Sequence, residues 1–171
     1  ELEEGKLSAP MRIALAKRYL PRGGSMPVEK LLELVRDPNM EVRQQALEIF
    51  QAGLKAVDPT AAIHRHVQRI DDELMIADRR VDLKSEERRL IVGAGKAVAP
   101  MAKALEDLLG NRVADGVIVV KEGHGLPLKH VKISEGGHPV PDEGGVRGTE
   151  KIISLVQDAG ERDLVICLIS G

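Results

Sequence analysis

Aromatic residues are almost absent from this sequence of 171 residues, which contains Tyr19 and Phe50 but no tryptophan. Proteins that bind single-stranded nucleic acid use aromatic side chains as stacking platforms, so this scarcity argues against that class. Charge points the same way, because 25 basic and 27 acidic residues give a formal net charge of −2. The chain therefore has no bulk field that would draw it to nucleic acid or to an anionic membrane.

Cysteine and long apolar runs are also lacking. The single cysteine, Cys167, excludes an internal disulfide and a multi-cysteine metal site, and it is typical of a reducing compartment. No apolar run approaches the roughly 20 residues that cross a bilayer, and the acidic residues 1–7 do not resemble a signal peptide. His64 and His66 lie two apart on a predicted helix and point in different directions, so they are not a metal pair. We expect a cytoplasmic protein with no metal site in this chain and no nucleic-acid or membrane partner.

The first part of the chain has a helical pattern. Residues 1–25 end in a Pro/Gly/Ser break and are interpreted as an uncertain extension or a cloning remnant. Helical spacing of apolar residues then runs from residue 26 to about residue 70, with Asp-Pro helix starts at 37–38 and 58–59. The last of these helices is expected to place Ile63, Val67 and Ile70 on one apolar face.

An alternation of apolar runs and helical stretches follows. The segment "ELMIADRRVDLK" at 73–84 suggests a small hairpin around Asp78 and Arg79. Beyond it we predict strands and helices in this order: strand 89–93, helix 97–109, strand 116–120, strand 130–134, helix 144–159 and strand 163–169. This order predicts an α/β fold, with a mostly parallel, Rossmann-like sheet covered by helices on both faces and preceded by N-terminal helices.

Ligands of such sheets bind at the carboxyl ends of the strands, and four glycine-rich segments are predicted to lie there: "GAGK", "KEGHG", "EGGHPVPDE" and the terminal "SG". In the first, Gly93 and Gly95 allow a sharp turn that exposes N–H groups, and the following helix presents its positive end. Lys96 adds a full charge there, where lysine is unfavourable unless an anion compensates it. We therefore favour a bound anion over the alternatives, a turn without a ligand and a solvated lysine.

This turn matches neither of two familiar nucleotide motifs. A Walker A loop needs four residues between its glycines and a hydroxyl after the lysine, where this chain has Ala97. A dinucleotide fingerprint needs glycine at position 98, which is Val98, and an acid at the end of the next strand, where Glu122 follows Lys121.

The segment at 135–145 predicts a rigid, irregular loop that contains Gly136 and Gly137. His138 precedes a proline, which holds it out of the helical region, so its imidazole could bond substrate oxygens or transfer a proton. Capping of the loop by His138 is an equal alternative. Asp142 and Glu143 are expected to cap the next helix.

The remaining candidates are weaker. Lys121 and His124 in "KEGHG" could line the same cleft, although loop residues of these types are usually only solvated. Ser170 and Gly171 follow the last strand and could begin another anion-binding loop. Cys167, inside an apolar strand, is expected to be a small core residue.

Taken in order, "AVDP", "VGAGKAVAPMA", "DGVIVVKEGHG", "EGGHPVPDE" and "DLVICLISG" resemble the N-terminal portion of the glycerate 2-kinase family, whose members are often labelled hydroxypyruvate reductase. The resemblance spans about Glu41 to Gly171 and is carried mainly by "GGHPVPDE" and the lysine after "GAG". It implies an enzyme of two α/β domains that moves the γ-phosphoryl group of ATP to the 2-hydroxyl of D-glycerate, with Mg²⁺. Lys96 would be the active-site lysine, His138 would belong to the family's loop, and Ser170 and Gly171 would open its glycine loop.

On this resemblance, residues 26–171 are expected to be the N-terminal domain of a two-domain kinase, cut within the glycine loop that starts at 170. We expect the isolated chain to be inactive, since its cleft needs a second wall, and prone to association, with a homo-oligomer as one outcome. Two alternatives stay open. An NAD-dependent reductase of hydroxypyruvate or another 2-hydroxyacid would show NADH turnover without ATP turnover, and a non-catalytic nucleotide- or anion-binding domain would bind without turnover.

Overall fold

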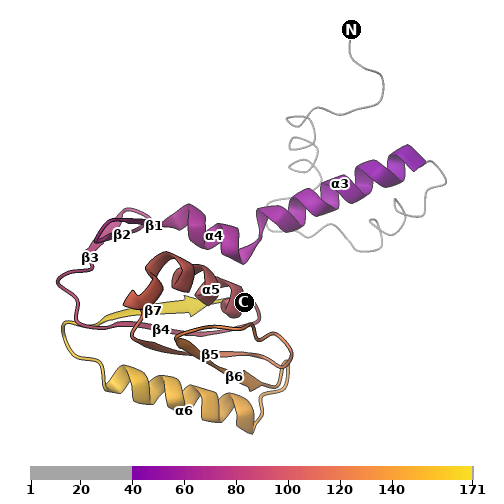
Figure 1. The fold of residues 1–171 in the computed structure, drawn as a ribbon. Coiled ribbons are helices and arrows are strands. Elements are labelled where there is room, and N and C mark those ends of the chain that lie inside the picture. The colour runs from indigo at the N-terminus through magenta and orange to yellow at the C-terminus, as the bar shows by residue number, and fades with distance from the viewer. Residues whose placement is uncertain (1–39, 171) are drawn as a thin grey trace. The chain divides into compact units, whose positions relative to one another are not determined.

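The computed structural model describes residues 40–170, in which the chain divides into two units, Glu1–Asp58 and Pro59–Gly171 (Figure 1). The described part of the first unit is helix α3 (Met40–Ala56). It confirms the helix predicted after Asp37 and Pro38, and Glu41 in its first turn and Lys55 in its last both suit the helix dipole. The predictions for residues 1–25 and for the helical pattern at 27–36 lie outside the described residues.

The second unit begins with helix α4 (Pro59–His66), which starts at the proline, as the Asp-Pro signal predicts. The predicted continuation of this helix is wrong, because residues 67–70 form strand β1 (Val67–Ile70). This strand pairs antiparallel with β2 (Glu73–Ile76), which pairs with β3 (Arg79–Asp82), so the predicted hairpin is confirmed as part of a three-stranded sheet. Val67 is buried and Ile70 is exposed, since they belong to a strand and not to one helix face.

A four-stranded parallel sheet forms the body of the second unit. Its strands, in the spatial order β6-β5-β4-β7, are β4 (Arg89–Ala94), β5 (Asp115–Lys121), β6 (Val131–Gly136) and β7 (Leu164–Ile169). Helix α5 (Val98–Leu109) connects β4 to β5 and helix α6 (Glu143–Gln157) connects β6 to β7. The two helices cover opposite faces (Figure 1), which confirms the predicted α/β fold.

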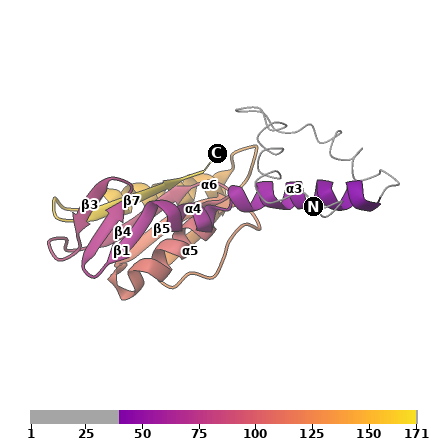
Figure 2. The ribbon, with the colours of Figure 1, turned by 90° about the horizontal axis from the view of Figure 1, so that it is seen from above.

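Helix α5 lies at the centre of the apolar core. Apolar or small residues occupy nearly its whole circumference, so it is buried on two sides: Val98, Ala99, Ala102, Ala104, Leu105 and Leu109 are all buried. One side packs on the sheet against Ile91, Ile118 and Leu168. The three-stranded sheet and α4 lie on the other side of α5 (Figure 1), where they bury Leu74 and Ile63. Figure 2 shows α4 beside α5 from above.

Strand β7 is an edge of the sheet, and this overturns one prediction. Cys167 was expected in the core because it lies in the apolar run "LVICLI", but it is exposed, as is Ile169. Their neighbour Leu168 points to the α5 side and is buried, whereas α6 packs on β5 and β6 and leaves the opposite face of β7 uncovered. Within residues 40–170, no helix has the length and apolar character that a membrane span requires.

The order of the strands reverses at β4. Helix α5 carries the chain from β4 to β5 on one side, and α6 carries it from β6 back past β5 and β4 to β7 on the other. In open α/β sheets the crevice at such a reversal, outside the carboxyl ends of the strands, is where ligands bind. The fold therefore directs attention to the loops that follow β4, β5, β6 and β7.

Candidate functional site

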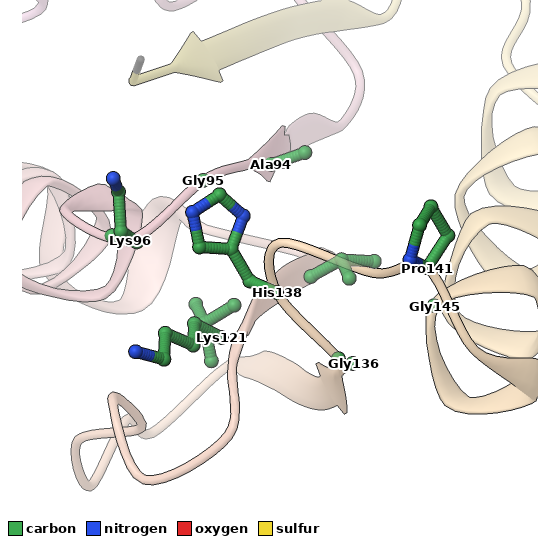
Figure 3. Close-up of a pocket in the computed structure, with 11 residues that line it drawn as sticks. Ala94, Gly95, Lys96, Lys121, Gly136, His138, Pro141 and Gly145 are labelled. Carbon is green, nitrogen blue, oxygen red and sulfur yellow. The ribbon is translucent and has the colours of Figure 1, made fainter.

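A pocket opens at the carboxyl ends of β4, β5 and β6 (Figure 3). Six residues singled out from the sequence line it: Gly95, Lys96, Lys121, Gly136, Gly137 and His138. Lys96 follows β4, Lys121 ends β5 and His138 follows β6, so three separate loops bring the basic side chains together. Ala94, Val119, Val120, Pro141 and Gly145 complete the wall.

The turn after β4 is held by bonds to its neighbours. Gly95 has a φ of +130°, and a Cβ there would lie 2.3 Å from the carbonyl oxygen of Ser170, so a side chain would both strain the backbone and clash. The N–H of Gly95 donates to the carbonyl of Val119 at 3.0 Å, and the N–H of Ala97 donates to the Ser170 hydroxyl at 3.0 Å. These amides are used within the chain, so the charge of Lys96 is what the turn offers to an anion.

Ser170 thus has a defined place beside the turn that bears Lys96. Its backbone N–H donates to the carbonyl of Ala94 at 3.2 Å, which extends the pairing of β4 and β7 by one step. Its hydroxyl accepts from the N–H of Ala97, the N-cap residue of α5, whose own side chain makes no capping hydrogen bond. The sequence placed Ser170 at this edge, but the bond between residues 73 apart in the chain could not be read from it.

The loop after β6 is organised by Asp142. This residue is the N-cap of α6 and accepts a hydrogen bond from the N–H of Gly145 at 2.9 Å, which confirms its predicted capping role. Hydrogen bonds from the backbone of Gly137, and then of Gly145, hold the pKa of the Asp142 carboxyl below its usual value. Since Gly137 precedes His138, the same carboxylate fixes the loop that carries the imidazole. The His138–Pro139 peptide bond is cis.

Other candidates lie outside this pocket. Gly93 is buried at the end of β4, where a Cβ would meet Leu168 and Val98, so its role is close packing. The ring Nδ1 of His124 lies 3.1 Å from the carbonyl oxygen of Glu122, and this exposed histidine does not reach the pocket wall. Gly171 is outside the described residues.

The pocket walls carry positive charge alone. Lys96, Lys121 and His138 line it, and no aspartate or glutamate does so among the residues that the structure describes. The same part of the chain contains no cluster of three or more His, Cys, Asp or Glu side chains that could hold a metal ion. The arrangement suits anionic ligands, since it offers two lysines and an imidazole, with apolar contacts from the valine and proline walls.

A buried carboxylate that the sequence did not reveal lies at the opposite edge of the sheet. Glu106 of α5 accepts hydrogen bonds from the N–H groups of Lys129, His130 and Val131 at 2.7 to 3.2 Å. Burial opposes its ionisation, but these three donors outweigh burial and hold the pKa of Glu106 below its usual value. Little in the sequence signalled this role, because Glu106 stands next to the exposed Asp107 in the same helix. Glu106 fixes the start of β6, whose far end carries the pocket loop.

Fold and site together define a parallel α/β domain with a basic pocket at the carboxyl edge of its sheet. Residues 45–171 match the family model described as "Domain of unknown function (DUF4147)". The chain belongs to this family.

Named relatives and solved structures agree with this assignment. The chain is 37% identical over 132 residues to the glycerate 2-kinase of Pyrococcus horikoshii, which covers 77% of this chain and 29% of the relative. It is 31% identical over 180 residues to human glycerate kinase, covering 93% of this chain and 34% of that protein. The crystal structure of glycerate kinase from Thermotoga maritima superposes with a TM-score of 0.58 at 34% identity, covering 74% of this chain and 27% of that one. The chain thus spans about a third or less of the length of these relatives.

Proposed function

We propose that this chain supplies part of the active site of a glycerate 2-kinase, an enzyme that transfers the γ-phosphoryl group of ATP to the 2-hydroxyl of D-glycerate. The observation that carries the proposal is the convergence of Lys96, Lys121 and His138 on one pocket at the carboxyl edge of the sheet. The names of the relatives and the ordered glycine-rich segments support it.

Phosphoryl transfer depends mainly on positioning two anionic reactants and on stabilising the charge of the group that moves. ATP supplies that phosphoryl group when it is bound. In the proposed mechanism Lys96 neutralises an anionic oxygen in the pocket, at the carboxyl end of β4. His138, on its braced loop, accepts a hydrogen bond from the substrate hydroxyl and orients it, or takes its proton.

No group of three or more His, Cys, Asp or Glu side chains that could hold a metal ion occurs among residues 40–170. Mg²⁺ that accompanies ATP is held largely by phosphate oxygens and water, so ATP would bring most of its ligands. Lys96 suits a phosphate group of ATP.

The alternative of an NAD-dependent reductase has less support. Val98 stands where the dinucleotide fingerprint needs glycine, and its side chain is fully buried against the core, so the turn is not an open cradle for a pyrophosphate. The second alternative for the same pocket is a domain that binds an anion without catalysis.

The test is release of ADP from Mg-ATP with D-glycerate, using the protein in the form that its gene encodes. Turnover that depends on D-glycerate, with the phosphate at the 2-position of the product, is the expected result. Oxidation of NADH by hydroxypyruvate without ADP release would instead establish the reductase, and binding of D-glycerate without either reaction would establish the binding domain.

A further inference from the structure

The lysine side chains of the second unit fall into two groups. Four have a partner in the structure: Lys84 pairs with Asp72, Lys103 with Asp107 and Lys132 with Asp115, and Lys151 donates to the Ser134 hydroxyl. Three others, Lys96, Lys121 and Lys129, have no ion pair or side-chain hydrogen bond within residues 40–170. Two of these three line the same pocket.

Lys121 is the more unusual of the two. It is half-buried, because it is the last residue of β5 and its backbone pairs in register with Gly136 of β6. Its ammonium group has no counter-ion within the described residues, so it is available to a ligand that brings negative charge to the pocket. Lys129 also lacks such a partner there, but it is exposed and lies outside the pocket.

The fold also keeps nearby carboxylates away from Lys121. Glu122, Glu135 and Asp142 line a second hollow, which shares Gly136 with the pocket but contains neither lysine. Lys121 and Glu122 are consecutive at a strand end, where successive side chains point to opposite faces. These three carboxylates share the second hollow with Arg147, whereas the pocket that Lys121 lines contains no carboxylate among the described residues.

The two lysines lie at different places along the pocket. Lys96 follows β4, next to Ser170 and the reversal of the strand order, which is where α/β sheets hold phosphate groups. Lys121 ends β5, whose neighbour β6 leads directly into the loop of His138. A reaction between a phosphate donor and a hydroxy acid has two anionic reactants, and this pocket has two unpaired lysines to receive them.

We propose that Lys121 binds the carboxylate of the acceptor and makes the pocket selective for hydroxy acids over neutral alcohols, while Lys96 serves the phosphoryl group. This assignment rests on the proposed kinase function. Lys121 then determines specificity, and it acts on substrate binding more than on the rate of the chemical step.

The experiment measures KM and kcat of the protein that the whole gene encodes, with D-glycerate and with its neutral amide, D-glyceramide, as acceptors. Lys121→Gln should raise KM for D-glycerate roughly 10- to 100-fold, the loss expected for one charge-assisted hydrogen bond. It should leave KM for D-glyceramide and kcat for both acceptors unchanged. Lys121→Arg should restore part of the selectivity. Lys129→Gln is the matched control, since it removes an unpaired lysine outside the pocket and should change neither KM.

An unchanged KM for D-glycerate in Lys121→Gln overturns the assignment, and so does an equal loss with both acceptors. If the wild-type enzyme releases no ADP with D-glycerate, the kinase proposal itself fails, and calorimetric binding of D-glycerate to the same variants then decides the role of Lys121. Weaker binding by Lys121→Gln but not by Lys129→Gln supports a carboxylate site. Equal binding by the two variants, or no binding to the wild type, overturns it.

Discussion

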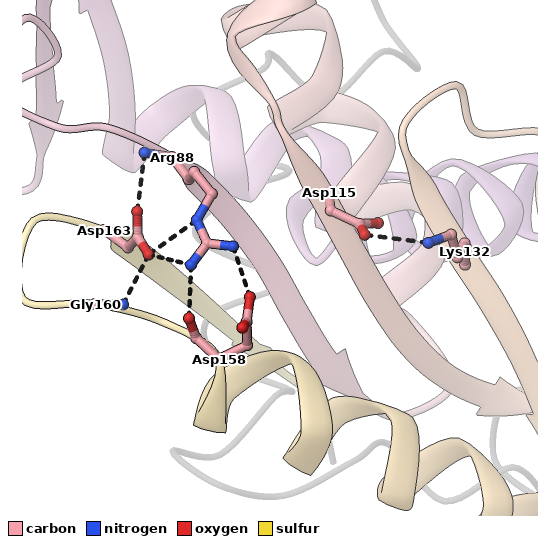
Figure 4. A network of polar contacts seen from close by, with 6 residues as sticks. All are labelled: Arg88, Asp115, Lys132, Asp158, Gly160 and Asp163. Carbon is pink, nitrogen blue, oxygen red and sulfur yellow. Dashed lines mark hydrogen bonds and ion pairs between the residues drawn. The ribbon is translucent and has the colours of Figure 1, made fainter.

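The two edges of the parallel sheet treat charge in opposite ways. At the amino edge, the Arg88 guanidinium donates to the carboxylates of Asp163, at 2.6 and 3.0 Å, and Asp158, at 2.8 Å, and Lys132 pairs with Asp115 (Figure 4). At the carboxyl edge, Lys96 and Lys121 have no carboxylate partner among residues 40–170. The amino edge uses charge to join strands and helices, whereas the pocket at the carboxyl edge leaves two lysines available to a ligand.

The pKa values of Asp163 and Arg88 show how strongly charges are paired at the amino edge. Hydrogen bonds from Arg88, and then from the N–H of Gly160, lower the pKa of Asp163 to about 2. Asp163 in turn, followed by Asp158, raises the pKa of Arg88. Each group thus stabilises the charged form of the other, as expected of a structural ion pair. The lysines of the pocket have no such partner within the described residues.

The largest effect on activity is expected at the carboxyl edge. Lys96→Ala should lower kcat/KM for D-glycerate by about 100- to 1000-fold, because it removes a preorganised positive charge from the transition state. The midpoint of thermal unfolding should not change, since Lys96 is exposed and has no partner within the described residues. ADP release and a melting curve on the same preparation measure both. An undiminished kcat/KM would end the assignment.

The largest effect on stability is expected at the amino edge. Glu106→Ala should lower the free energy of unfolding by about 3 kcal/mol, because three backbone N–H groups near the start of β6 lose their acceptor. Glu106→Gln keeps one acceptor oxygen and should cost less. Urea unfolding gives these values, and a variant as stable as the wild type would show that Glu106 does not hold this segment.

A pH effect is expected for Asp163. Because its folded-state pKa is lowered to about 2 from the ordinary value of 3.8, its contribution to stability is present above about pH 4. That contribution is lost as the pH falls from about 4 toward 2, when the folded carboxylate becomes protonated. The melting midpoints of the wild type and Asp163→Asn should therefore differ by a constant amount between about pH 7 and pH 5, because this range lies above both the folded and the unfolded pKa of Asp163. The difference should shrink below about pH 4. A difference independent of pH would refute the ion pair as its cause.

The smallest effect is expected for Lys132→Ala. Its ion pair with Asp115 is largely exposed, so the free energy of unfolding should fall by less than about 0.5 kcal/mol. Kinetics with D-glycerate should match the wild type, because Lys132 lies at the amino edge. A loss of activity in this variant would contradict the division of roles between the two edges.

The sequence predicted the parallel sheet well because its signals are local. Apolar runs bounded by glycine mark β4 and β5, and the spacing of Val98, Ala102 and Leu105 marks α5. Strand β1 was missed because Ile63, Val67 and Ile70 also satisfy a helical spacing, and only the pairing with β2 decides between the two structures. The exposure of Cys167 was missed for a related reason, since an apolar run does not reveal that its strand lies at an edge.

The sequence predicted which residues of the candidate site lie near one another, because the sheet topology determines this. Parallel strands bring their carboxyl ends to one edge, so Lys96, Lys121 and His138 could be expected near one another before any coordinates. The hydrogen bonds that hold these loops could not be predicted. The bonds between Ser170 and Ala97 and between Asp142 and Gly137 depend on how the loops pack. The absence of carboxylates from the pocket wall also required the structure, as Glu122 and Glu135 lie close to Lys121 in the sheet but line the other hollow.

The hydroxyl of Ser170 touches the first turn of α5, so the ends of β7 and β4 are not independent. A ligand that displaces Ser170 would release the Ala97 N–H and alter the placement of the neighbouring ammonium group. If that ligand changed the affinity of Lys96 for an anion by some factor, the bound anion would change the affinity for the ligand by the same factor. The hydrogen bond of 3.0 Å between Ala97 and Ser170 thus joins the two loops, and a ligand that changed the position of one would be expected to change the other.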